Sequence, residues 1–370
     1  MSLSEFSSLQ TQVLWAVFAV SVVFGAVAQK THFCTMGAIS DIVNMGDWTR
    51  MRMWGMAVGV AVLGFHGLGW LGVIDPAKNF YTNGRVVWLS ALVGGGFFGF
   101  GMVLASGCGS KTLVRLGAGS LKALVVFAVM GVTAFATLRG LFAVVRVNTV
   151  DTVAFDMAGG SSLPVWLLGV LGAKTPTALM ALATLIGVAL VVWAFASRSF
   201  RQWNNVLAGV GIGGAVVAMW WVTGHLGFVP EHPETLDAVF LRTNSGVMES
   251  LTFTAPMAYT LDWFIYFSDT SKTLTVGVAS VAGVVVGSFL YSVATRSFRW
   301  EGFRDTQDTA LHLAGAVLMG VGGVTAMGCT VGQGLSGLST LSLTSVIAVL
   351  GIVLGSLGGF RFQMWLIMRD

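Results

Sequence analysis

Long apolar runs constrain this chain more than any other feature. Residues 177–196, TALMALATLIGVALVVWAFA, contain no charged side chain, and a helix of about 20 residues crosses the ~30 Å hydrocarbon core of a bilayer. Similar runs recur along all 370 residues, of which 55% are hydrophobic and only 10% charged. Soluble domains carry about 25% charged residues. The sequence therefore predicts an all-α, polytopic membrane protein whose apolar surface contacts membrane lipids.

Hydropathy and turn residues divide the chain into about nine full-length spans and several shorter pieces. The predicted spans lie near residues 11–29, 52–73, 87–106, 119–143, 177–196, 204–222, 273–294, 310–327 and 339–366. Four apolar pieces are too short or too broken by glycine, serine or threonine to span: 33–47, 107–117, 250–266 and 328–338. Irregular backbone at membrane depth must be buried in protein or line a polar cavity. We therefore expect re-entrant half-helices within one integral membrane domain, residues 1–370.

The basic loops predict how the chain is oriented. Arginines concentrate in residues 197–203 and 295–304, whereas 147–163 and 228–240 carry acids and few cations. Cytoplasmic loops of membrane proteins are rich in Lys and Arg. We expect a multi-pass protein of the bacterial inner membrane with its N-terminus in the periplasm and its C-terminus in the cytoplasm.

One pattern of small residues occurs twice. Residues 99–108 and 320–329, which are 221 positions apart, both read G-x-G-x-V-x-A-x-G-C. On the topology above the two copies open from opposite sides of the membrane, because the extra span 177–196 reverses the second. The repeats would be inverted and cover approximately 11–145 and 204–366. Transporters built from inverted repeats bind substrate between the repeats, at broken helices, so the pattern predicts a transporter and not an enzyme.

Three cysteines, Cys34, Cys108 and Cys329, each open one of the short segments. An odd number of cysteines far apart in the sequence does not fit a disulfide framework. At the amino end of a half-helix, free amide protons and the helix dipole favour an anion, and thiol sulfur is polarisable. A single buried cysteine is often only a small apolar residue, but three at similar broken positions predict a relay for a small sulfur-containing anion such as thiosulfate.

Residues beside the cysteines complete the predicted relay. Lys111 follows Cys108 by three positions, and a cation at membrane depth is a functional candidate, although a position at the cytoplasmic interface would also explain it. The remaining candidates flank the two repeat-related cysteines: Gly107, Gly109, Gly328, Thr330 and Gln333.

Other functions remain open to different degrees. Sulfite or a selenium compound would suit the same soft site, and the 17 methionines leave a Cu(I) channel as a cation alternative, since Cys and Met select Cu(I). A membrane thiol-redox enzyme would need a reactive pair such as C-x-x-C, which the sequence lacks. Histidines without metal-ligand spacing and the lack of basic runs predict no bound metal, no cofactor and no nucleic-acid partner.

The segments KTHFCTMGAISD (30–41), GCGSKTLVRLGAG (107–119) and GCTVGQGL (328–335) resemble signature segments of the YeeE/YedE family of thiosulfate-type transporters. The resemblance spans nearly the whole chain. It implies an hourglass-like fold of nine spans plus re-entrant helices, a relay along Cys34, Cys108 and Cys329, and a separate cytosolic TusA-like sulfur-carrier protein that receives the sulfur. Some members carry a further cysteine in the third re-entrant segment, where this chain has LTFTAPMAY (251–259).

Overall fold

A computed structural model of the protein describes residues 3–157, 160–170, 172 and 175–368. Within these residues nine helices are long and apolar enough to cross a membrane, which confirms an all-α, multi-pass membrane protein. They are α1 (Leu3–Thr31), α3 (Thr49–Trp70), α4 (Trp88–Leu104), α6 (Leu121–Arg139), α9 (Pro176–Phe195), α10 (Trp203–Trp221), α12 (Val276–Ala294), α13 (Thr306–Thr325) and α14 (Leu343–Ile367).

The four broken segments form short helices between the long ones. They are α2 (Thr35–Met45), α5 (Gly109–Gly117), α11 (Thr254–Ile265) and a helical stretch that contains the π-helical turn η3 (Gly332–Gly337). The sequence did not predict a second set of short elements, which are α7 (Leu141–Asn148), η1 (Val150–Thr152), α8 (Leu163–Val170) and η2 (Val222–Leu226). Two antiparallel strand pairs complete the described residues: β1 (Arg85–Val86) with β2 (Phe155–Asp156), and β3 (Phe228–Val229) with β4 (Val239–Phe240).

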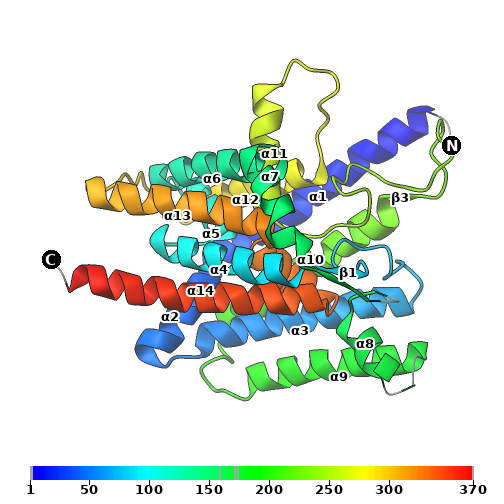
Figure 1. The fold of residues 1–370 in the computed structure, drawn as a ribbon, viewed down its shortest axis with the longest axis horizontal. Helices are drawn as coiled ribbons and strands as arrows, with labels where there is room; N and C mark the ends of the chain where they lie inside the picture. Colours follow the sequence, from blue (N-terminus) through cyan, green and yellow to red (C-terminus); the bar gives the residue numbers. More distant parts are fainter. Residues whose placement is uncertain (1–2, 158–159, 171, 173–174, 369–370) are drawn as a thin grey trace.

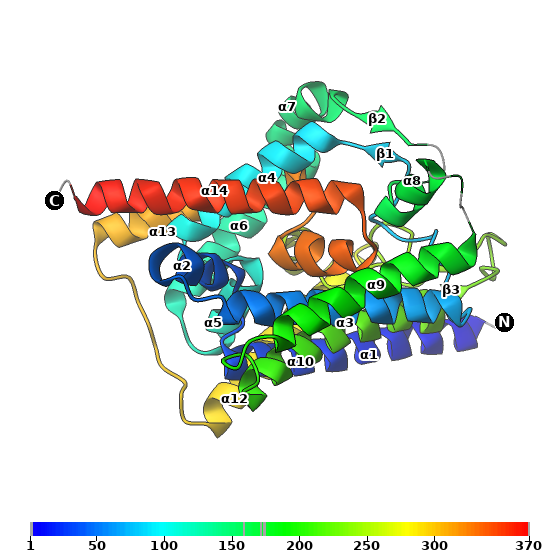
Figure 2. The same ribbon diagram turned by 90° about the horizontal axis from the view of Figure 1, so that it is seen from below.

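The long helices run side by side, and the two ends of the chain lie at opposite ends of the bundle (Figure 1). We call these two ends the N-terminal face and the C-terminal face. The arginine-rich connections 196–202 and 295–305 lie at the C-terminal face, because α9 and α12 end there and α10 and α13 begin there. In Figure 2 the orange half-helix around η3, together with α2 and α5, lies among the long helices.

Glycines let the central helices approach closely. A Cβ atom on Gly94 of α4 or on Gly322 of α13 would collide with the backbone of the facing helix, and the same holds between Gly101 and Gly315. Small residues at helix contacts permit such close packing in membranes. The crossing of α4 and α13 therefore tolerates no side chain at these positions, and it fixes the two long helices that lead into Cys108 and Cys329.

Helix contacts in the first part of the chain have counterparts in the second. α4 packs on α14, and its counterpart α13 packs on α6. In the same way α1 packs on α12, and its counterpart α10 packs on α3. Two further contacts, α4 with α13 and α1 with α10, join the counterparts themselves. The pattern maps the first six helices, α1 to α6, onto α10, α11, α12, α13, the η3 half-helix and α14. α9 stands outside this scheme and packs on α3.

Candidate functional site

The three cysteines follow the ends of α1, α4 and α13 on the same kind of turn. The residue two positions before each cysteine has a left-handed backbone, with φ of 52° at His32, 54° at Ser106 and 56° at Met327. Non-glycine residues rarely adopt this conformation. In the two repeat-related turns a hydrogen bond of 2.8 Å runs from Gly107 N to Met102 O and from Gly328 N to Gly323 O, which closes each long helix with a Schellman motif.

Each cysteine therefore stands at the amino end of a short helix, the position expected from the sequence. Cys34 is the N-cap of α2, and its Sγ accepts the backbone N–H of Gly37 at 3.4 Å. Cys329 Sγ accepts the N–H of Gly332 at the same distance. Cys108 is the N-cap of α5, with its Sγ 3.3 Å from the Ser110 hydroxyl.

The structure brings the three cysteines together inside the bundle. Cys34 is 9% exposed, and Cys108 and Cys329 are fully buried. The thiols of Cys34 and Cys108 interact directly. Thr330, the neighbour of Cys329 in the chain, faces the Cys108 thiol but makes no hydrogen bond of ordinary geometry. Its hydroxyl thus links the Cys329 turn to the Cys108 thiol and has capacity for a further partner.

Cations gather beside Cys34 and Cys108. Lys111 is an electrostatic neighbour of both thiols and also of Arg50 and Arg115. The Arg50 guanidinium occupies the space that a side chain on Gly37 would need, at the start of α2. Its Nε lies 3.2 Å from Asp41 Oδ2. The sequence analysis missed Arg50 as a site residue, because α3 brings it back to α2 from the following helix.

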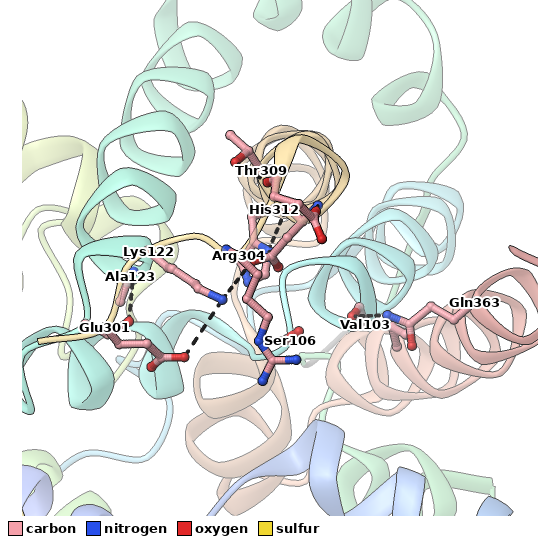
Figure 3. Close-up of polar contacts among 12 residues, drawn as sticks. Val103, Ser106, Lys122, Ala123, Glu301, Arg304, Thr309, His312 and Gln363 are labelled. Atoms are coloured by element: carbon pink, nitrogen blue, oxygen red, sulfur yellow. Dashed lines mark hydrogen bonds and ion pairs between the residues drawn. The ribbon is translucent and has the colours of Figure 1, made fainter. Parts of the chain in front are cut away.

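A buried ion pair fixes the connection at the C-terminal face (Figure 3). Lys122, 6% exposed, lies 2.7 Å from Asp308 Oδ2 and 3.9 Å from Glu301 Oε1. His312 Nδ1 lies 3.0 Å from the other oxygen of Asp308. Glu301 also pairs with Arg115 of α5 at 3.6 Å. The start of α13, the start of α6 and the half-helix behind Cys108 are therefore held by one charged network.

Neutral hydroxyl groups lie close to the Cys329 turn. A Cβ on Gly332 would collide with the Thr252 hydroxyl and would lie 3.5 Å from that of Tyr81. Tyr81 neighbours both Cys329 and Ser336, and the backbone of Phe253 contacts Cys329. Burial raises the pKa of the Tyr81 phenol, so the phenol remains a hydrogen-bond donor. These residues come from distant loops, which is why the sequence did not reveal them.

The other predicted residues occupy supporting places. Gln333 is fully buried, donates to Ala326 O at 2.6 Å and accepts from Ser345 Oγ at 2.6 Å, so its amide ties the turn before Cys329 to α14. A Cβ atom would lie 3.3 Å from Lys111 Cβ if built on Gly107, 3.3 Å from Met130 Cε if built on Gly109, and 3.3 Å from Gln333 N if built on Gly328. A direct contact of these four residues with substrate stays a prediction.

A cavity of about 320 Å³ reaches the Cys329 turn, and we call it the N-terminal cavity. Met327 and Gly328 form its inner wall. Its polar lining comes from separate elements: Tyr81, Arg146, Asn244, Ser245, Glu249, Thr252 and Tyr259. Among the described residues, no group of three or more His, Cys, Asp or Glu side chains is arranged to hold a metal ion.

The nine-helix bundle, with polar turns buried between its long helices, defines a polytopic membrane transporter. The chain belongs to the Sulphur transport family, whose model matches residues 30–357 and so includes all three cysteine turns. This result confirms the family resemblance. The chain is 28% identical over 350 residues to the thiosulfate transporter TsuA of Escherichia coli (strain K12), covering 90% of this chain and 89% of that protein. It is 25% identical over 356 residues to the thiosulfate transporter TsuA of Spirochaeta thermophila, covering 93% and 97%.

Proposed function

We propose that this protein takes up thiosulfate, or a closely related small sulfur-containing anion, across the inner membrane. Its family transports sulfur, and the two relatives above are named thiosulfate transporters. The observation that carries the proposal is the set of three buried thiols, each at the amino end of a short helix. Helix amino ends attract anions, and thiols offer weak S–H donors to a terminal sulfur.

The proposed path runs from the N-terminal cavity to the cationic cluster at Lys111. The anion enters beside Gly328, meets Cys329, passes the Thr330 hydroxyl to Cys108, and then reaches Cys34. Adjacency of Cys34 with Cys108, and of Thr330 with Cys108, supports this order. Lys111 and Arg50 attract the anion at the far end. The thiols act as hydrogen-bond donors throughout, and no covalent bond forms or breaks.

The proposed orientation places the N-terminal face in the periplasm. Arginine-rich connections at the C-terminal face support this orientation, because such loops stay in the cytoplasm. The matching helix contacts of the two halves support inverted repeats of approximately 11–145 and 204–366. A cysteine introduced at Ser7 should react with an impermeant thiol reagent in intact cells, and one introduced at Arg361 should not. Labelling of both introduced cysteines from the same side of the membrane would contradict this topology.

A separate cytosolic TusA-like sulfur-carrier protein is the proposed acceptor. The anion would arrive beside Lys111 and Arg115 at the C-terminal face, where such a carrier could reach it. Cells that lack the carrier should accumulate little sulfur from thiosulfate, while proteoliposomes without it should still take up the intact anion. Uptake by cells that does not depend on any carrier would remove this partner.

Competition for uptake tests the substrate. Initial uptake of labelled thiosulfate into proteoliposomes should be reduced by unlabelled thiosulfate and weakly by sulfate, because sulfate lacks a terminal sulfur that suits a thiol. Strong competition by sulfite or by a selenium oxyanion would favour those species instead. Inhibition by Cu(I), with copper accumulating in the vesicles, would favour a cation channel.

A further inference from the structure

Glu249 places a carboxyl group in the N-terminal cavity, in the path proposed for an anion. It lines the cavity from the segment between β4 and α11. Its Oε1 accepts the backbone N–H of Ser245 at 2.7 Å. Its own carbonyl accepts the Thr223 hydroxyl at 2.6 Å. The hydrogen bond from Ser245 holds one carboxyl oxygen in place, and the bond from Thr223 fixes the backbone of the residue.

The second observation is that Glu249 has no ion-pair partner among the described residues. In the part of the chain that the structure describes, none of the ion pairs within 4.0 Å involves Glu249. Arg146, the cation that shares the cavity, has its Nε 3.4 Å from Asp151 Oδ2 instead. The phenols of Tyr81 and Tyr259 are also electrostatic neighbours of Glu249.

Burial raises the pKa of Glu249, although hydrogen bonds from Ser245 and Asn244 oppose the shift. An ionised carboxylate has acceptors only, whereas a protonated one offers an O–H donor. A buried negative charge without a partner is costly, and it would also repel an incoming anion. The phenols of Tyr81 and Tyr259 beside it are donors of the same neutral kind. The cavity therefore suits an anion when Glu249 carries its proton.

We propose that Glu249 binds the transported anion as a protonated carboxyl group that donates a hydrogen bond to it in the N-terminal cavity. The role rests on the anion uptake proposed above. Lowering the external pH increases the fraction of Glu249 that is protonated and can donate. Raising the pH ionises the carboxyl group, and its negative charge repels the anion. Uptake therefore falls as the pH rises through the pKa of Glu249.

Proteoliposomes with the N-terminal face outward provide the test. Uptake of labelled thiosulfate at subsaturating concentration is measured at external pH from about 5 to about 8, the range over which a buried glutamate titrates. Wild-type uptake should fall about tenfold for each pH unit above the pKa. Glu249→Gln keeps the carbonyl that accepts from Ser245 and carries a donor at every pH, so its uptake should be nearly constant. Glu234→Gln, at an exposed acid of the preceding connection between β3 and β4, should follow the wild type.

An unchanged pH profile in Glu249→Gln would overturn the proposal. If that variant does not assemble, Glu249→Asp keeps a titratable carboxyl group and should show the same fall with a displaced midpoint; a flat profile would overturn the proposal.

Infrared difference spectroscopy separates this role from the proposed function, because it needs no transport. As the pH is lowered through the midpoint of the uptake profile, the purified wild type should gain the C=O stretch of a protonated carboxylic acid, which Glu249→Gln lacks. Absence of that difference would overturn the protonated state even if thiosulfate is transported. If the spectral difference is present but the protein does not take up thiosulfate, Glu249 is protonated as proposed and thiosulfate is rejected as the substrate.

Discussion

The Cys108 and Cys329 turns share a backbone but differ in their chemistry. Both follow G-x-G-x-V-x-A-x-G-C, both have a left-handed residue two positions before the cysteine, and both close their long helix with the same hydrogen bond. Beyond the cysteine, however, Lys111 and Arg115 of the first copy correspond to Gly332 and Ser336 of the second. The repeat has kept the geometry that presents a thiol and has changed the charge that surrounds it.

The difference has a steric cause at Gly332. Any side chain there would meet the hydroxyl groups of Thr252 and Tyr81, so the polar groups beside Cys329 are supplied by other segments. Beside Cys108 the half-helix supplies its own cation, Lys111. A path with neutral donors at one thiol and cations at the other would hold an anion more strongly at the cationic end, beside Cys108.

Replacing the cysteines should have the largest effect and shows whether the shared geometry serves transport. Cys108→Ala and Cys329→Ala each remove a donor from a fully buried position, where an unmet polar group costs about 1–3 kcal/mol, so uptake should fall about tenfold or more. Serine keeps a donor without the soft sulfur and should restore uptake only in part. Cys34→Ala should also impair uptake of labelled thiosulfate.

A purely structural role for the cysteines predicts the opposite order. Alanine would then be tolerated and the more polar serine would be worse. If Cys108→Ala and Cys329→Ala are expressed normally and take up thiosulfate at the wild-type rate, the shared turns serve only to end the long helices.

The second prediction concerns the side-chain hydrogen bonds that stabilise the two turns, which differ. Gln333 corresponds to Thr112 in the first copy. Gln333→Leu leaves Ala326 O and the Ser345 hydroxyl without their buried partner, at about 1–3 kcal/mol each. Thr112 donates only to Cys108 O, which also accepts the Thr112 backbone N–H. In detergent, Gln333→Leu should lower the unfolding temperature clearly and Thr112→Val only slightly. Equal shifts in the unfolding temperature would show that these side chains stabilise the two turns equally.

The sequence predicted most of the fold but only part of the site. The hydrophobic runs and their broken intervals predicted the long helices and the short helices after each cysteine, because the cost of exposing polar backbone to lipid dominates both. Tyr81 and Glu249 could not be found this way, since they lie in connections whose hydropathy resembles that of any loop. Arg50 was not singled out as a site residue, because its contact with α2 depends on how two helices pack.

Lys111→Gln is the third test, and it removes the charge that distinguishes the first copy from the second. Glutamine keeps the length and a donor, so the half-helix should stay intact. Loss of one cation beside two thiols should reduce uptake about threefold to tenfold at subsaturating thiosulfate, as expected for an ion contact of about 1 kcal/mol, and less at saturation. Unchanged uptake at low substrate would make Lys111 an interfacial residue, and the cationic side of the comparison would then rest on Arg50 and Arg115.

The smallest effect is expected at Tyr81, a neutral donor near the Cys329 turn. Tyr81→Phe removes the hydroxyl near Gly332 and Ser336 and leaves the ring packed on Trp220. One neutral hydrogen bond contributes about 0.5–1.5 kcal/mol, so the KM for thiosulfate should rise about twofold to tenfold with little change in the maximum rate. Tyr266→Phe is a matched control, because that phenol is 52% exposed. Because burial raises the pKa of Tyr81, the effect should be the same across the assay pH range, unlike that of Glu249. A fall in maximum rate without a change in KM would assign Tyr81 to the structure of the Cys329 turn, and the neutral side of the path would then depend on Thr252 and Thr330.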